Sequence, residues 1–178
     1  SDGLTHGMYL TLTEYLQETP FAKRLISAEA VVSALRGRKS NSEIELIKEA
    51  IDETLDIFAR VSEFVRVGMS EKEVAQFIQD IVVERNLEFA WDQAHCPAVF
   101  TGPDSAGAHA GPTDRIIKAG HLMNIDFGIR KNGYVSDLQR TWYFLREGES
   151  DAPPEVKKGF YTIRDSIQKA AAVLKPGV

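Results

Sequence analysis

The sequence predicts an α+β domain in which an antiparallel sheet carries helices packed on one face. Three observations predict this class. Two stretches have helical periodicity and each begins with a capping box, a later stretch alternates apolar and polar residues around Asn132-Gly133, and a third helical stretch follows. The chain has 178 residues, which suits one domain or one domain with a short leader.

The two early helices follow from their capping residues and their apolar spacing. Ser40 and Glu43 form the first capping box, and Gly68 is predicted to end that helix. Its expected buried face consists of Ile44, Ile47, Ile51, Leu55, Phe58 and Val65. Ser70 and Glu73 form the second capping box. The buried face of the second helix is expected to consist of Val74, Phe77, Ile78, Ile81 and Val82.

Residues 122–130 and 134–145 alternate apolar and polar side chains and predict two continuous strands. The dipeptide Asn132-Gly133 between them is a strong hairpin signal. A third helix is expected over residues 156–174, before the Lys175-Pro176-Gly177 break.

This hairpin brings two aspartates together if its loop has two residues. Asp126 then faces Gln139, and Asp137 faces Gly128, so the aspartates share one face on a diagonal of roughly 7–8 Å at the backbone. Two such carboxylates can hold a pair of metal ions about 3.5–4 Å apart. A three-residue loop would place them on opposite faces. Aspartates on edge strands also serve solubility, so the spacing alone leaves a solvated pair as an alternative.

His109 is the best-placed histidine, because the small residues at positions 107–112 leave room for a ligand. The other histidines give a weaker signal, with His121 expected to be exposed: His6, His95 and His121. The single cysteine, Cys96, excludes an internal disulfide and a thiolate zinc cluster. No basic neighbour would activate it, so a buried, inert thiol is expected.

Composition excludes several classes of function. The formal net charge is −5 and no long Lys/Arg run is present, which argues against nucleic-acid binding. No apolar stretch is long enough to cross a bilayer, and residues 1–20 lack a signal-peptide pattern. No membrane partner and a cytoplasmic location are therefore expected.

Several motifs resemble the creatinase/methionine-aminopeptidase family of metallopeptidases, which has the pita-bread fold. They are Phe100-Thr101-Gly102, Ala108-His109, Asn124-Ile125-Asp126-Phe127-Gly128 and the run from Gly133 to Thr141. Two turns are similar to recurrent family turns, at residues 67–71 and 174–178. The resemblance covers about residues 30–178 and is greatest to Xaa-Pro aminopeptidases and dipeptidases.

The resemblance implies a domain organisation and a chemistry. Residues 1–38 would be the end of an N-terminal domain and a linker, and residues 39–178 the first half of the catalytic domain. Asp126 and Asp137 would be metal ligands for two divalent ions (Mn, Co or Zn), and His109 would contact the peptide substrate. The ions would share a water, lower its pKa toward 7, and so produce the hydroxide that attacks the scissile carbonyl. The intact enzyme would be a homodimeric exopeptidase that removes an N-terminal residue before proline.

Three departures qualify this implication. Gln139 stands where many members have Thr or Ser, and Ala110 where many proline-cleaving members have a second histidine. The family's remaining ligands, one histidine and two glutamates, would lie after Val178, so the chain alone is expected to be inactive. Two alternatives stay open: a catalytically inactive interaction or chaperone module with this fold, and a creatinase-like hydrolase of a small amidine.

Overall fold

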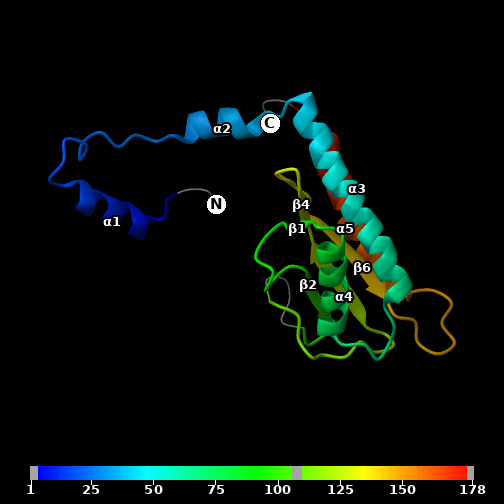
Figure 1. The fold of residues 1–178 in the computed structure, drawn as a ribbon. Coiled ribbons are helices and arrows are strands. Elements are labelled where there is room, and N and C mark those ends of the chain that lie inside the picture. The colour runs from blue at the N-terminus through cyan, green and yellow to red at the C-terminus, as the bar shows by residue number, and fades with distance from the viewer. Residues whose placement is uncertain (1–3, 106–109, 176–178) are drawn as a thin grey trace. The chain divides into compact units, whose positions relative to one another are not determined.

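The computed structural model describes residues 4–105 and 110–175 (Figure 1). The chain divides into two compact units, Ser1–Asn41 and Ser42–Val178. The first unit contains α1 (His6–Leu16) and α2 (Glu29–Gly37), and neither helix buries a residue. The assignment of residues 1–38 to the end of another domain stays a prediction.

The second unit begins with the two predicted helices, α3 (Asn41–Phe64) and α4 (Glu71–Glu84). The capping box of α4 is confirmed, because the Ser70 side chain accepts from the Glu73 N–H and the Glu73 carboxylate accepts from the Ser70 N–H. α3 ends at Phe64, four residues earlier than predicted, and Gly68 instead forms the turn to α4 with a φ of 98°. Phe64 there stacks on Phe77 of α4, with ring centroids 3.8 Å apart.

The buried face of α3 differs from the predicted one. Phe58 is buried as expected, but Ile44 and Leu55 are 40% and 39% exposed. The buried residues of α3 are Ala50, Thr54, Ile57, Phe58 and Val61. This stripe has the same helical spacing as the predicted one but passes through a polar residue, Thr54, which a search for apolar periodicity skips.

The strands form two small antiparallel sheets. One sheet has the order β2-β3-β6, from β2 (Ala98–Thr101), β3 (Leu122–Phe127) and β6 (Leu138–Tyr143). The other has the order β1-β4-β5, from β1 (Glu88–Phe89), β4 (Ile129–Lys131) and β5 (Tyr134–Val135). The two continuous strands predicted from the sequence are therefore each broken, at Gly128 and at Ser136-Asp137.

The break has a local cause at Ser136. The Ile129 N–H donates to the Ser136 side-chain Oγ at 2.9 Å, where a regular ladder would use the Ser136 carbonyl. That carbonyl oxygen lies so close to Gly128 that a Cβ on residue 128 would be 2.0 Å from it. Only glycine fits this approach.

The core lies between α3, α4 and one face of the strands. Phe127, Met123 and Ile125 of β3 are fully buried against α3 and α4, and the rings of Phe58 and Phe127 meet edge to face at 6.0 Å. The last helix, α5 (Pro154–Val173), buries no residue. Within residues 4–105 and 110–175, no helix has both the length and the apolar character to cross a bilayer.

Candidate functional site

The hairpin turns at Asn132-Gly133, as predicted. Both residues have positive φ, 52° and 83°, the combination that a two-residue type I′ turn needs. Lys131 pairs with Tyr134 across the turn, and Asp126 pairs with Gln139 farther along. The predicted register is therefore confirmed.

The register places Asp126 and Asp137 on the same face. The pairing is the same on both sides of the strand break, so Asp137 lies opposite Gly128 and diagonal to Asp126. Ile129 and Ser136 are both buried on the core side, which leaves the two aspartates on the other side, Asp126 half-buried and Asp137 exposed. Asp137 makes no hydrogen bond or ion pair within the described part of the chain.

Polar side chains of the neighbouring rungs extend this face. Asn124 lies two residues before Asp126 on β3, and its Nδ2 donates to Thr141 Oγ1 at 2.9 Å. Gln139 Nε2 points at Asp126 Oδ2 from 3.4 Å. The Asn124 Oδ1 atom is buried and accepts no hydrogen bond from residues 4–105 and 110–175. A buried acceptor of this kind costs about 1–3 kcal/mol when unsatisfied, so it marks a place where a cation or donor fits.

The donor atoms on this face suit a hard divalent cation. Asp126 and Asp137 offer carboxylate oxygens and Asn124 offers an amide oxygen, the ligand types that Mg²⁺, Ca²⁺ and Mn²⁺ prefer. Within the described residues, no group of three or more His, Cys, Asp or Glu side chains is placed to hold a metal ion. The face therefore fits part of an oxygen-ligand site. Asn124 was missed as a site residue by sequence reasoning, although its position two residues before Asp126 could have indicated it.

Cys96 lies beneath this face as a buried thiol, as predicted. It is fully buried, and its Sγ is 3.4 Å from the Gly128 carbonyl oxygen. Burial raises the pKa of the Cys96 thiol above its ordinary value, and the negative charge of Asp126 acts in the same direction. The thiol therefore stays protonated and unreactive at neutral pH.

The predicted substrate contact, His109, lies outside the described residues. The two ends of its loop are joined by a residue that sequence reasoning missed, Glu71 of α4, which is 2% exposed. Its carboxylate accepts from the Thr101 N–H at 2.7 Å, the Thr113 N–H at 3.0 Å and the Thr113 hydroxyl at 2.6 Å. One carboxylate thus holds both ends of the segment between Gly102 and Pro112.

Two other histidines make their contacts with groups other than the two aspartates. His121 is half-buried rather than exposed as predicted, because its ring packs beside Gly102 and its Nδ1 lies 3.5 Å from Thr101 Oγ1. His95 is exposed, and its carbonyl accepts from the Trp91 indole N–H at 2.8 Å.

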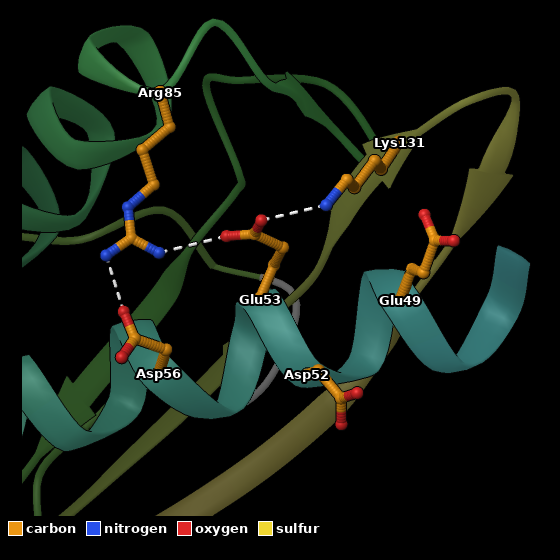
Figure 2. Close-up of a pocket in the computed structure, with 6 residues that line it drawn as sticks. All are labelled: Glu49, Asp52, Glu53, Asp56, Arg85 and Lys131. Carbon is orange, nitrogen blue, oxygen red and sulfur yellow. Dashed lines mark hydrogen bonds and ion pairs between the residues drawn. The ribbon is translucent and has the colours of Figure 1, made fainter.

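A charged groove of about 370 Å³ lies between α3, the end of α4 and the hairpin. Figure 2 shows Glu53 of α3 between Arg85 and Lys131, and Arg85 also pairs with Asp56. The carboxylate oxygens of Glu53 lie 2.9 Å from the Arg85 guanidinium and 2.9 Å from Lys131 Nζ. The hydrogen bond from Lys131, together with Arg85, lowers the pKa of Glu53 below its ordinary value. These paired charges join three elements, and we assign this groove a structural role.

A second, apolar groove of about 630 Å³ lies between the strands and α5. Leu122 and Thr141 line it on the strand side, and Val156, Phe160 and Ile163 line it on the helix side. Leu122 alternates with Asn124 and Asp126 along β3, so this groove borders the same face of the sheet as the aspartates.

Comparisons with known proteins point to one family. The sequence profile described as Metallopeptidase family M24 matches residues 45–178. A Mycoplasma genitalium protein with the provisional name Xaa-Pro aminopeptidase is 32% identical over 157 residues, which are 84% of this chain and 42% of that protein.

Solved structures agree on the fold. Prolidase from Thermococcus sibiricus aligns with a TM-score of 0.77 at 26% identity, over 100% of this chain and 46% of that chain. An X-Pro aminopeptidase from Thermotoga maritima aligns with a TM-score of 0.73 at 24% identity, over 98% of this chain and 46% of that one. The α+β class is thereby confirmed, and the chain spans less than half the length of each of these proteins.

Proposed function

The chain belongs to metallopeptidase family M24, and on that premise we propose that the intact protein is a di-metal exopeptidase. The proposed reaction is hydrolytic removal of an N-terminal residue, with preference for a residue that precedes proline. The observation that carries the proposal is the hairpin register, which puts Asp126 and Asp137 on one face. The preference for proline is supported by the names of the similar proteins, an X-Pro aminopeptidase and a prolidase.

Asp126 and Asp137 are the proposed ligands, with Asn124 beside them. Two divalent ions, Mn, Co or Zn, would supply an acidified water and polarise the scissile carbonyl. Asp126 is half-buried, so its charge acts in a medium less polarisable than water and favours a cation more than an exposed carboxylate would. Gly128 lies opposite Asp137, and the Ser136 carbonyl oxygen occupies the position where a side chain of residue 128 would stand.

His109 is the proposed contact to the substrate, on the strength of its sequence motif. A neutral or protonated imidazole there would donate a hydrogen bond to the substrate and to the negative charge that develops on the carbonyl oxygen. The remaining ligands, one histidine and two glutamates by family resemblance, would come from sequence beyond this chain. The 178 residues alone should therefore bind divalent metal weakly and hydrolyse no peptide.

The test is Asp137→Asn in the intact protein, which keeps the shape of the side chain and removes its charge. Cleavage of an Xaa-Pro peptide is assayed with added Mn²⁺, Co²⁺ or Zn²⁺, and activity should be abolished. Asp114→Asn is the matched control, because Asp114 is an exposed aspartate whose ion pair is to Lys72 at 2.8 Å. Near wild-type activity in Asp137→Asn would remove Asp137 from the ligands and contradict the proposal.

A further inference from the structure

Two buried hydroxyl groups connect α3 to the hairpin at the point where its strands break. Thr54 Oγ1 and Ser136 Oγ lie 2.6 Å apart, although 82 positions separate them in the sequence. Thr54 is fully buried and Ser136 is 2% exposed. Because groups buried this deeply are withdrawn from bulk water, they must satisfy their hydrogen bonds within the protein.

The neighbouring groups favour one donor and one acceptor in the hydrogen bond between these two hydroxyls. Thr54 Oγ1 donates to the Ala50 carbonyl at 2.9 Å, which uses its single proton. Ser136 then donates to Thr54, and it accepts from the Ile129 N–H at 2.9 Å. The opposite direction would leave Ser136 to donate only to the Ile129 carbonyl at 3.4 Å. The chain therefore runs from the Ile129 N–H through both hydroxyls to α3, and each bond polarises the next.

This chain of hydrogen bonds determines the local backbone before Asp137. In a regular antiparallel pair, Ile129 and Ser136 would exchange two backbone hydrogen bonds. Here the Ser136 N–H does donate to the Ile129 carbonyl at 3.0 Å, but the return bond goes to the Ser136 side chain. The Ser136 carbonyl is left against Gly128 instead. Asp137 follows directly, so the hydroxyl that orients Ser136 also sets the direction from which Asp137 projects.

Other links between α3 and the hairpin are weaker candidates for this role. Lys131 reaches Glu53 at 2.9 Å, and the Tyr134 hydroxyl donates to Glu43 at 3.0 Å. The Lys131–Glu53 side chains are 30% and 26% exposed, and solvent-screened ion pairs typically contribute about 0–1 kcal/mol. Leaving a buried hydroxyl unsatisfied costs about 1–3 kcal/mol. These two links hold the tip of the hairpin, as does Asn132, whose Nδ2 donates to Glu49 at 3.4 Å. The Trp142 indole donates to Ser62 at 3.0 Å, but Trp142 lies five residues after Asp137.

We propose that Thr54 is a positioning residue for Asp137. Through Ser136 it fixes the direction of the carboxylate, while touching neither metal nor substrate. The inference rests on the proposed function, in which Asp137 is a metal ligand.

The test is Thr54→Val in the intact protein, because valine keeps the shape of threonine and removes its hydroxyl. Metal affinity is measured by Mn²⁺ titration, with free Mn²⁺ followed by electron paramagnetic resonance. Loss of a residue that orients a ligand typically lowers metal affinity by about 10–100-fold, and we expect a loss in this range. The visible absorption spectrum of the Co²⁺-loaded protein should change as well. Thr54→Ser keeps the hydroxyl and should restore both measurements.

Thr101→Val is the matched control. Thr101 is 1% exposed and its hydroxyl donates to the Leu122 carbonyl at 3.1 Å, so the variant also loses a buried hydroxyl. It should lower the urea midpoint of the metal-free protein without changing Mn²⁺ affinity. Ser136→Ala breaks the same chain as Thr54→Val and should match its loss of affinity. The double variant should lose no more than either single variant, since the two residues act as one unit.

Different failures can be told apart. Wild-type Mn²⁺ affinity and Co²⁺ spectrum in Thr54→Val, together with lost affinity in Asp137→Asn, would overturn the positioning role alone. Wild-type affinity in Asp137→Asn would overturn the proposed function and the positioning role with it. If Thr54→Val does not fold, the smaller change Ser136→Ala decides by the same titration: wild-type affinity there overturns the inference, and a 10–100-fold loss supports it.

Discussion

Replacing Gly128 by alanine should destabilise the second unit strongly, because the new methyl group has nowhere to go. It would lie 2.0 Å from the Ser136 carbonyl oxygen and 3.0 Å from the Ala90 Cβ. Carbon and oxygen normally approach to about 3.3–3.6 Å, so the two backbone segments would have to separate by more than 1 Å. The obstructing atom belongs to the backbone and cannot rotate away as a flexible side chain could.

The expected change in the free energy of unfolding is the difference between a cost in the folded state and a gain from the unfolded state. Overpacking typically costs about 1–3 kcal/mol, and a backbone clash belongs at or above the upper end of that range. The lower conformational entropy of alanine in the unfolded chain returns about 0.4–1 kcal/mol. We therefore expect Gly128→Ala to lower the free energy of unfolding by about 2–3 kcal/mol or more.

Urea unfolding followed by tryptophan fluorescence measures this effect, because Trp91 and Trp142 both lie in the second unit. The indole of Trp142 donates to Ser62 of α3 at 3.0 Å and reports directly on packing against that helix. Gly159→Ala is the control, since a Cβ on that residue of α5 meets nothing within 4 Å. It should raise stability by about 0.5–1 kcal/mol through helix propensity. A Gly128→Ala variant as stable as the wild type would refute the reasoning.

Three further outcomes are expected. Cys96 should react with iodoacetamide far more slowly in the native protein than in urea at pH 8, since burial raises its pKa; equal rates would mean that the thiol is accessible. Glu71→Ala should cost about 3 kcal/mol or more by urea unfolding, because two backbone N–H groups lose a buried acceptor, and Glu71→Gln, which keeps one carbonyl oxygen, should cost less. The stability contributed by Glu53 should be full above its ordinary pKa of 4.5 and be lost as pH falls through its lowered folded value. Glu53→Gln should therefore flatten the dependence of the urea midpoint on acid pH, and an unchanged dependence would contradict the assignment.

Local sequence signals predicted the parts of the fold that depend on neighbouring residues. The hairpin register follows from Asn132-Gly133, because a type I′ turn is specified by its own two residues. The start of α4 follows from Ser70 and Glu73 for the same reason. Both features required no knowledge of what packs against them.

Other features depend on partners far away in the chain, and the sequence could not predict them. The break in the strands arises from Ser136 and from its contact to Thr54, 82 positions away. The buried carboxylate of Glu71 has partners 30 and 42 positions away. Each of these residues looks like an ordinary polar helix or strand residue, and only its tertiary contact reveals its role.

The candidate site also divides into features set by local sequence and features set by distant contacts. The shared face of Asp126 and Asp137 followed from the two-residue loop and the period of the strand. The buried amide oxygen of Asn124 did not follow, because a polar residue on an alternating strand is expected to be solvated until the neighbouring strands are placed. Burial is a property of the assembled sheet rather than of one strand.

The hydrogen bonds of Glu71 have a consequence for how freely the chain can change its length. They fix Thr101 and Thr113, so the sheet receives the same anchorage whatever lies between those two residues. The entropy cost of closing a flexible loop grows only with the logarithm of its length, and a doubling costs about 0.6 kcal/mol. A longer connection between Thr101 and Thr113 would therefore add little to the entropy cost of closure. The turn between Lys131 and Tyr134 is instead specified by the positive φ of Asn132 and Gly133, and a shift of its pairing by one residue would turn every following side chain of the strand to the opposite face. The first connection is thus held at its two ends, where Glu71 binds it, and the second by the conformation of its own two residues.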